Sequence, residues 1–364
     1  GRYPAACSGL DTWHAPNPQP DTSAESLLFG RRPRRPCSVG SSAGSRIVSR
    51  QRERGGREWW SGVIMAVTSA VREKTTLLPV FLCRSIAFVL QTSLWLFQQE
   101  VDSHIEKLWQ ILRASGVFQH ESFEPFLSAA AFFFFIGLWG FVDFFVPCAS
   151  KHRTFPSEDL SSWFGGTRIR DQILWYIIPL VALDLIFPRR QLPESAPTLA
   201  RLTAEVVGAI AVYDIVFFVW HVTVHKSPSL FRRVHATHHR CRVQRAPEAV
   251  RHTFVDGTMN VACSVFALNV LGCHPLSRAV YDVVIIGMIT ELHAGYDLPW
   301  QLHNLVPFGL YGGAPRHERH HRDGAVYFQK FGTILDDAFG FVPVEDLGRP
   351  SKRKHPVSNV PPHQ

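Results

Sequence analysis

Apolar residues in this chain are gathered into six windows, with charged or polar segments between them. The windows lie at 77–97, 126–147, 172–187, 203–220, 254–271 and 276–292. A helix of roughly 20 apolar residues crosses the hydrocarbon core of a bilayer, so the first, second and fourth windows predict transmembrane helices. The third window is short, and only a brief segment around Pro275 separates the last two. We therefore expect this pair to dip into the membrane and return.

A soluble protein with long buried helices is the alternative interpretation of this pattern. The stretch AAAFFFFIGLWGFV at 129–142 disfavours it, because a helix of this composition has no polar face to present to water. The hydropathy pattern therefore predicts an all-α, polytopic membrane protein.

Charge is distributed unevenly along the chain. The formal net charge is +8, and residues 1–64 contain ten Arg and no Lys against five acids, with few apolar residues. Such a segment buries too little surface to offset the entropy of ordering, so we expect a disordered basic arm. The first Met is Met65, so the arm is either a targeting segment or lies upstream of the true start, and we favour the second interpretation.

Four regions are expected from these patterns. They are the arm at 1–64, hydrophobic and amphipathic helices at 65–125, a membrane domain at 126–348 with its core at 213–340, and a disordered basic tail at 349–364. The seven cysteines are odd in number and form no CxxC pair, which disfavours a disulfide framework.

Basic residues indicate which side of the membrane each loop faces. Four of them follow the second window: Lys151, Arg153, Arg168 and Arg170. Positive charge in short loops marks the cytosolic side, so the return crossing at 203–220 also ends at the cytosol. The basic run that follows, 226–251, could indicate nucleic-acid binding, but no aromatic residues interleave with it for base stacking. Contact with anionic lipid headgroups is the favoured interpretation.

Histidines cluster where this cytosolic segment begins. Twelve of the 18 histidines lie between positions 221 and 321. Eight of them form one HxxxH pair and two HxxHH motifs: His221 and His225; His235, His238 and His239; His317, His320 and His321. Residues at i, i+3 and i+4 share a helix face, so we expect each cluster to aim its imidazoles at a common point. One such pair is usually an ordinary surface or core feature, but three clusters at the mouths of apolar segments indicate a metal site.

The ligand set restricts the kind of metal site. Structural zinc sites use four ligands and favour Cys, whereas eight imidazoles suit two ions that keep positions open for oxygen. Imidazole alone leaves iron, zinc, copper and nickel as candidates. A zinc protease of the HExxH type is excluded because Val222 occupies the position of its Glu. The GSSAG stretch at 40–44 matches a hydrolase motif but has no preceding strand, so we assign it no function.

Carboxylates near a metal site usually orient its imidazoles through the second ring nitrogen. Asp214 lies seven residues before His221, on the same predicted helix face. Further candidates for this role are Glu291, Glu318, Asp323, Asp336 and Asp337.

The order HxxxH, HxxHH, HxxHH resembles that of the sterol desaturase and fatty acid hydroxylase superfamily, whose members are membrane-bound non-haem diiron enzymes. Within it, the stretches at 271–280, 291–313 and 317–340 resemble the cholesterol 25-hydroxylase branch. The likeness covers about residues 120–345 and is strongest from 213 onward. It implies a four-helix transmembrane bundle under a cytosolic helical cap, residence in the endoplasmic reticulum membrane, and insertion of one oxygen atom from O2 into a lipid C–H bond, most closely that of a sterol.

The resemblance also implies a set of iron ligands. These are His221, His225, His235, His238, His239, His317, His320 and His321, and His293 matches one further family histidine. His252 and His303 match less general patterns and stay outside the set. His274 lies between two apolar helices and is expected to be structural.

Two departures from the family pattern concern the substrate. The third histidine motif is followed by RDGAVYF at 322–328, where relatives usually carry Asn, and DDAFG at 336–340 replaces a WDxxFGT-like ending. Both stretches are expected near the substrate mouth of the cap.

The implied enzyme needs two Fe ions, O2 and an electron donor. Electrons should come from an external NADPH-dependent reductase or cytochrome b5, because no dinucleotide-binding GxGxxG occurs in the chain. We expect a dry substrate pocket lined by Phe217, Phe218, Trp220 and the aromatic residues of 296–311.

Two alternatives remain open. The same centre could desaturate a sterol or oxidise a sterol methyl group. A metal transporter is the alternative outside enzymes, and it should carry polar residues along several spans. Asp143 and Asp184 are the only acidic residues deep in the first three windows, which disfavours a transporter.

Overall fold

The computed structural model describes residues 78–154, 169–186, 192–240 and 244–347. Regular structure in these residues is helical, with two isolated bridges and no strand. The predicted all-α class is confirmed for this part of the chain. The predicted arm at 1–64 and tail at 349–364 lie outside the described residues.

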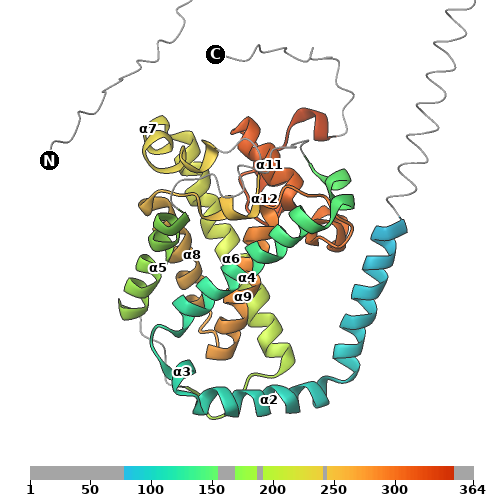
Figure 1. Ribbon diagram of the computed structural model, residues 1–364, viewed down its shortest axis with the longest axis vertical. Helices are drawn as coiled ribbons and strands as arrows, with labels where there is room; N and C mark the ends of the chain where they lie inside the picture. The colour runs from blue at the N-terminus through green and yellow to red at the C-terminus, as the bar shows by residue number, and fades with distance from the viewer. Residues whose placement is uncertain (1–77, 155–168, 187–191, 241–243, 348–364) are drawn as a thin grey trace, which may run out of the picture. The chain divides into compact units, whose positions relative to one another are not determined.

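Five long helices form the centre of the fold (Figure 1). They are α4 (Phe123–Phe145), α5 (Ile169–Ile186), α6 (Leu199–Lys226), α8 (Phe254–Val270) and α9 (Pro275–Leu292). Helix α4 packs against α9, α5 packs against α8, and α6 packs against both α8 and α9. The predicted hairpin is present, since α8 and α9 are separated only by the residues from Leu271 to His274.

Further helices lie at the two ends of this bundle (Figure 1). At the end drawn uppermost are α7 (Pro228–Leu230), α11 (Gly313–Asp323) and α12 (Ile334–Phe339). At the opposite end lie α2 (Gln98–Ala114) and α3 (Gly116–Gln119). The short helix α10 (Leu302–Leu305) precedes α11.

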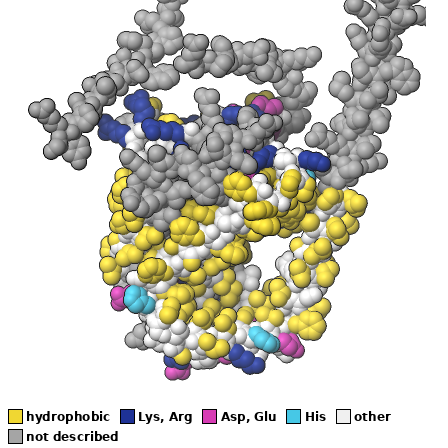
Figure 2. Space-filling model, viewed as in Figure 1, with side chains coloured by type: hydrophobic (Ala, Val, Ile, Leu, Met, Phe, Trp, Pro, Cys, Tyr) yellow, Lys and Arg dark blue, Asp and Glu magenta, His cyan; other side chains and the backbone are white. Residues whose placement is uncertain are grey.

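Three described helices are long and apolar enough to cross a membrane: Leu78–Leu96, Phe123–Phe145 and Leu199–Lys226. They correspond to the first, second and fourth predicted windows. Large apolar side chains point outward from them, including Phe88 (70% exposed) and Phe134 (65%). Figure 2 shows hydrophobic side chains over the broad middle of one face, with Lys and Arg gathered towards its edges. Exposing an apolar surface of this extent to water is unfavourable, so the surface indicates membrane association.

A close helix contact places α9 against α4. A Cβ atom at Gly287 of α9 would lie only 2.8 Å from the ring of Phe135 in α4. A small residue is therefore needed at this crossing, as is common where helices approach closely in membranes. The contact fixes the position of α9, whose C-terminal end leads into His293.

A buried ion pair ties the same two helices together at their N-terminal ends. Arg278 of α9 donates from Nε and Nη2 to the two carboxylate oxygens of Glu124 in α4, at 2.8 and 2.7 Å. Both side chains are less than a tenth exposed. The bidentate geometry satisfies the carboxylate and fixes the register of the two helices.

We expect Glu124→Gln to lower the free energy of unfolding by about 3–5 kcal/mol, because it leaves a buried guanidinium without its carboxylate. The double variant Glu124→Leu with Arg278→Met should lose much less, because it removes both charges. The measurement is the fraction of detergent-solubilised protein that stays monodisperse after heating. Equal losses in the single and double variants would contradict this account.

Candidate metal centre

Helix α6 delivers the first two histidines to the end of the bundle where α11 lies. His221 and His225 are one turn apart on this helix, which ends at Ser227 before Pro228. Their ring centroids are 4.8 Å apart. The predicted sharing of one helix face is therefore confirmed for this pair.

The second motif does not lie on a regular α-helix. His235 closes a π-helical turn at Phe231–His235, and His238 begins a 3-10 turn at His238–Arg240. Two different turn geometries therefore occur within ten residues, and neither has α-helical spacing. As a result, the adjacent residues His238 and His239 face different partners.

The third motif lies on α11, where His317, His320 and His321 are all buried. Gly324 ends this helix with φ +66°, a left-handed conformation that favours glycine. A ninth histidine, His293, occupies the C-cap of α9. Its Nδ1 donates to the carbonyl of Ile289 at 2.8 Å, and its Nε2 lies 3.0 Å from Nε2 of His317.

Nine histidines meet in two groups, and within each group the candidate ligand atoms lie within 4.8 Å of one another. The five-histidine group contains His221, His225, His235, His239 and His320, and the four-histidine group contains His238, His293, His317 and His321. The groups adjoin, since the rings of His239 and His321 are 4.6 Å apart. The expectation that each motif has its own common point is wrong, because both HxxHH motifs divide their members between the two groups.

Hydrogen bonds fix which ring nitrogen of most of these histidines is free. Nδ1 faces an oxygen acceptor in six of the nine: His221, His235, His238, His239, His293 and His320. The acceptors are main-chain carbonyls except for His235, where Asp256 accepts at 2.7 Å. A proton on Nδ1 leaves the lone pair of Nε2 available for a metal ion.

The spacing of these free nitrogens fits metal ligation. Nε2 of His221 and Nε2 of His235 are 3.1 Å apart, although both rings carry their proton on Nδ1. Two bare lone pairs at this distance repel each other unless a cation lies between them. Two nitrogens about 2.1 Å from one ion, at right angles, are about 3.0 Å apart. Among the described residues, the buried Nε2 atoms of His225, His239 and His320 also find no hydrogen-bond partner.

Burial favours the neutral form of six imidazoles of this site. Removal from water lowers the pKa of His239 and of His293 to about 3. Burial followed by the neighbouring imidazoles lowers the pKa of four more histidines well below the usual range: His238, His317, His320 and His321. Neutral imidazole is the form that binds metal ions, so the site is ready for ligation at neutral pH.

Asp256 is the carboxylate that orients the imidazoles. Its Oδ2 accepts from Nδ1 of His235 and from Nδ1 of His252, both at 2.7 Å. Thr253 caps α8 by accepting from the N–H of Asp256, and its hydroxyl donates to the carbonyl of Val234. A signal for this role is present in the sequence, namely the spacing of four residues between His252 and Asp256.

The six predicted acids have other contacts among the described residues. Asp214 accepts from the N–H groups of Lys330, Phe331 and Gly332, so it holds a loop rather than an imidazole. Asp336 accepts from the N–H groups of Phe328 and Gln329. Glu291 accepts from the N–H of Leu302, and Glu318 accepts from the hydroxyl of Thr154. Asp323 pairs with Arg319, and Asp337 pairs with Arg316. The expectation that these acids orient imidazoles is therefore wrong for the described contacts.

Three further histidines lie outside both groups. His252 stacks on His238 with ring centroids 4.2 Å apart and is bound to Asp256. Nε2 of His303 pairs with Asp297 at 2.9 Å. His274 accepts the N–H of Leu276 at the start of α9, which agrees with its predicted structural role.

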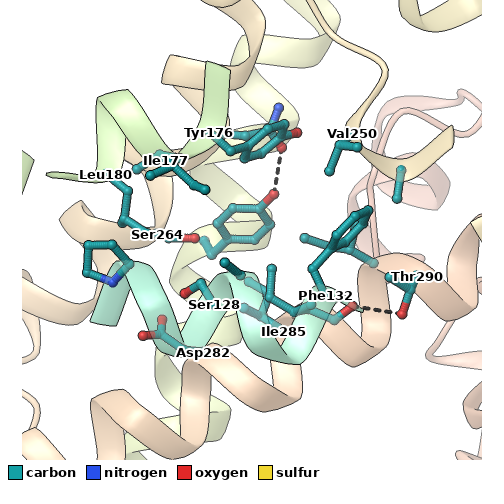
Figure 3. A pocket seen from close by; sticks show the side chains of 18 residues that line it. Ser128, Phe132, Tyr176, Ile177, Leu180, Val250, Ser264, Asp282, Ile285 and Thr290 are labelled. Atoms are coloured by element: carbon teal, nitrogen blue, oxygen red, sulfur yellow. Dashed lines mark hydrogen bonds between the residues drawn. The ribbon is translucent and has the colours of Figure 1, made fainter. Parts of the chain in front are cut away.

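An apolar cavity lies between α4, α5, α8 and α9 (Figure 3). Its empty space, including the part that is open to the outside, is about 820 Å³. The predicted pocket lining is wrong for this cavity. The residues that line the cavity do not include Phe217, Phe218, Trp220 or the aromatic residues of 296–311. Phe218 packs instead against Phe339 of α12, with ring centroids 5.7 Å apart.

A buried lysine is hydrogen-bonded to two polar residues that line this cavity. Lys330 donates from Nζ to Oδ1 of Asn260 at 2.6 Å and to the hydroxyl of Tyr213 at 2.9 Å. Burial lowers the pKa of Lys330 to about 8. Nδ2 of Asn260 donates to the carbonyl of Asp256, so this lining residue is hydrogen-bonded to the segment that orients His235.

Comparison with known proteins identifies the family. The family model described as Fatty acid hydroxylase matches residues 206–341. Cholesterol 25-hydroxylase of Mus musculus is 34% identical over 169 residues, which cover 46% of this chain and 57% of that protein. Cholesterol 25-hydroxylase of Homo sapiens is 29% identical over 246 residues, covering 65% of this chain and 89% of that protein.

A third relative extends the likeness. Cholesterol 25-hydroxylase-like protein 2 of Danio rerio is 30% identical over 258 residues, covering 64% of this chain and 87% of that protein. The alignment with the mouse protein spans little more than half of that relative's length. No solved structure matches the chain. The family model and the zebrafish relative show that this chain belongs to the fatty acid hydroxylase family, within the sterol desaturase and fatty acid hydroxylase superfamily.

Proposed function

We propose that this chain is a membrane-bound diiron monooxygenase that inserts one oxygen atom from O2 into a C–H bond of a sterol. The observation that carries the proposal is the meeting of nine buried or partly buried histidines in two adjoining groups. The family membership supports a lipid or sterol hydroxylase, and the relatives named cholesterol 25-hydroxylase favour a sterol.

The two histidine groups would each hold one ion. The five-histidine group offers His221, His225, His235, His239 and His320, and the four-histidine group offers His238, His293, His317 and His321. Imidazole suits iron among other transition metals, and two adjoining groups would hold two such ions. When bound, two irons supply the activation of O2 that no amino-acid side chain can provide.

The remaining residues prepare the site for this chemistry. The carbonyl of Phe328 and the carboxylate of Asp256 keep the Nδ1 protons of His221 and His235 in place, so their Nε2 atoms stay directed at the metal position. The apolar walls of the cavity hold the lipid and exclude water. One oxygen atom enters the product and the other leaves as water, which takes two electrons and two protons. An external reductase or cytochrome b5 is the proposed electron donor.

The proposed membrane arrangement follows from the basic loops. The histidine-bearing end would face the cytosol of an endoplasmic reticulum membrane, and four helices would span the bilayer. Exposed basic residues lie at this end on the segment that follows α6, namely Lys226, Arg232, Arg233 and Arg240. Their charge supports a cytosolic position next to anionic headgroups.

His320→Ala in the full chain tests the function directly. Expressed in a sterol-supplied microbial host, the natural chain should give a sterol that has gained one oxygen atom, whereas a desaturase would give one that has lost two hydrogen atoms. We expect His320→Ala to reduce product and bound iron by at least about 100-fold, because the change removes a ligand rather than an outer partner. Product is measured by mass spectrometry and iron by elemental analysis. His104→Ala, on exposed α2, is the matched control. Normal iron and product in His320→Ala would refute the assignment.

Asp256→Asn tests the role of the orienting carboxylate. The amide keeps the shape of the side chain but removes the charge that fixes His235, so we expect roughly 10- to 100-fold weaker iron binding. The measurement is iron retained during titration with a chelator. Asp323→Asn, at an acid paired with Arg319, should retain iron like the natural chain. Indistinguishable curves for the two variants would show that Asp256 has no such role.

Acid should destabilise the metal-free protein. Unfolded histidines take up protons below a pKa of about 6.5, whereas folded His239 and His293 do so only near about 3. Stability from neutral imidazoles is thus complete above pH of about 6.5 and declines as the pH falls towards 3. The measurement is the thermal midpoint in chelator between about pH 8 and pH 5. A variant with Asn at His317, His320 and His321 should show a shallower decline, and an equally steep one would contradict this explanation.

A further inference from the structure

We propose that the buried positive charge of Lys330 acts on the metal centre and favours the ferrous form of iron bound there. The inference rests on the proposed function, because it takes the two histidine groups as iron sites. It adds a residue that is not a candidate ligand and that adjusts how readily the centre is oxidised. Such a residue acts on the ions by its charge alone.

Lys330 is a buried cation with uncharged hydrogen-bond partners. It is only 6% exposed, and its Nζ donates to Oδ1 of Asn260 at 2.6 Å and to the hydroxyl of Tyr213 at 2.9 Å. In the part of the chain that the structure describes, no carboxylate forms an ion pair with this ammonium group. Because burial lowers the pKa of Lys330 only to about 8, the ammonium form predominates at neutral pH.

Aromatic rings hold this ammonium group in place. Its Nζ lies 4.1 Å from the centre of the Phe217 ring and 5.5 Å from the centre of the Tyr213 ring. The faces of aromatic rings attract a cation without neutralising it. The two rings are stacked on each other, and the hydroxyl of Tyr213 also donates to Oδ1 of Asn260 at 3.0 Å. The surroundings therefore fix the position of the ammonium group and leave its charge intact.

This charge lies close to both histidine groups. The ring of Phe217 is 5.3 Å from the ring of His221, which belongs to the five-histidine group. In the four-histidine group, burial is the main cause that lowers the pKa of His293 and of His317, and the positive charge of Lys330 is a further cause. The charge of Lys330 therefore reaches the candidate ligands of both ions.

Two carboxylates also lie near Lys330, and they leave the sign of its effect unchanged. The charges of Asp256 and Asp214 both favour the ammonium form of Lys330. Asp256 is hydrogen-bonded to His235 and His252, and Asp214 accepts from main-chain N–H groups. Coulomb energies add pairwise, so the contribution of Lys330 to the energy of a nearby cation is repulsive whatever these acids contribute.

The repulsion has a defined consequence for iron. Oxidation of one bound ferrous ion to the ferric form releases one electron and adds one positive charge to the centre. Lys330 repels this added charge, so it raises the reduction potential, and burial limits the screening of this effect by solvent and salt. The external electron donor of the proposed function therefore returns the centre to the ferrous form more readily. The same charge weakens the binding of any divalent cation to the metal-free site.

Lys330→Met tests the effect on the reduction potential, because it removes the charge and keeps a side chain of similar shape. The full chain, purified in detergent and loaded with iron, is titrated with dithionite and ferricyanide. The ferric fraction is followed by Mössbauer spectroscopy. We expect the midpoint potential to fall by about 59 mV, which is a tenfold shift in the ferric-to-ferrous ratio for one electron. An unchanged or higher potential would overturn the proposal.

Lys226→Met is the matched control for a lysine that lies over aromatic rings. Nζ of Lys226 is 5.2 Å from the centre of the Phe341 ring, but this lysine is exposed, so water and salt screen its charge. The control should keep the natural potential. A fall as large as that of Lys330→Met would refute the role of the buried charge.

Asn260→Asp keeps the lysine and places a carboxylate at the acceptor that lies 2.6 Å from its Nζ. The variant cancels the charge instead of removing it, so the potential should fall here as well. This measurement decides the matter if Lys330→Met does not fold. A potential that stays at the natural value would show that charge at this position does not reach the centre.

Zinc binding to the metal-free chain gives a readout that depends on neither iron nor turnover. We expect Lys330→Met to bind Zn²⁺ roughly tenfold more tightly than the natural chain in competition with a chelator, because the repulsion of the divalent ion is removed. A lysine with only a structural role predicts the opposite, since its loss would release Tyr213 and Asn260 and loosen the site. Weaker or unchanged zinc binding in the variant would contradict the proposal.

Turnover separates this inference from the proposed function. An oxygenated sterol from the natural chain, with a potential and a zinc affinity that do not depend on Lys330, would support the function and refute the inference. A potential and a zinc affinity that change as expected, without any oxygenated product, would support the inference and refute the function. A natural chain that binds neither iron nor zinc would refute both.

Discussion

The structure depends on bringing nine imidazoles together, most of them buried and turned towards each other. Six of the rings direct Nδ1 at an oxygen acceptor, yet most carbonyls inside a helix are already used by the helix itself. The acceptors come instead from helix ends and turns, as with the carbonyls of Arg251, Val326 and Phe328. This requirement explains why the histidines gather where the long helices stop, and why short, irregular turns cover that end of the bundle.

The bundle below serves this centre by fixing where its helices end. The ion pair of Glu124 with Arg278 and the close contact at Gly287 set the position of α9 against α4. The cavity occupies the space that these helices leave, and Lys330 is hydrogen-bonded to Tyr213 and Asn260 of its lining. One set of helices therefore positions both the candidate metal ligands and the apolar cavity.

Periodicity and spacing in the sequence identify the helices and eight of the clustered histidines, because both depend on local geometry. His293 has no local motif, and only the family resemblance indicates it. The division into two groups could not be predicted, since local spacing does not reveal which other segments face each histidine. The HxxHH motif is divided in the same way on the regular helix α11 and on the irregular turns at Phe231–His235 and His238–Arg240. The partners of Asp214 and Asp256 could not be predicted either. The spacing of residues along the chain places a carboxylate on a helix face but does not reveal which segment packs against that face.

Asp214 has a mechanical consequence for the centre. It lies in the middle of α6 and accepts from three consecutive N–H groups of the loop 330–332. The same loop follows Phe328, whose carbonyl holds the ring of His221 seven residues further along α6. Helix α6 and this loop are thus hydrogen-bonded to each other at two points, Asp214 and His221. A movement of α6 in the bilayer would therefore carry the imidazole of His221 and its acceptor together. The position of this imidazole relative to its acceptor is in this way protected against small movements of α6.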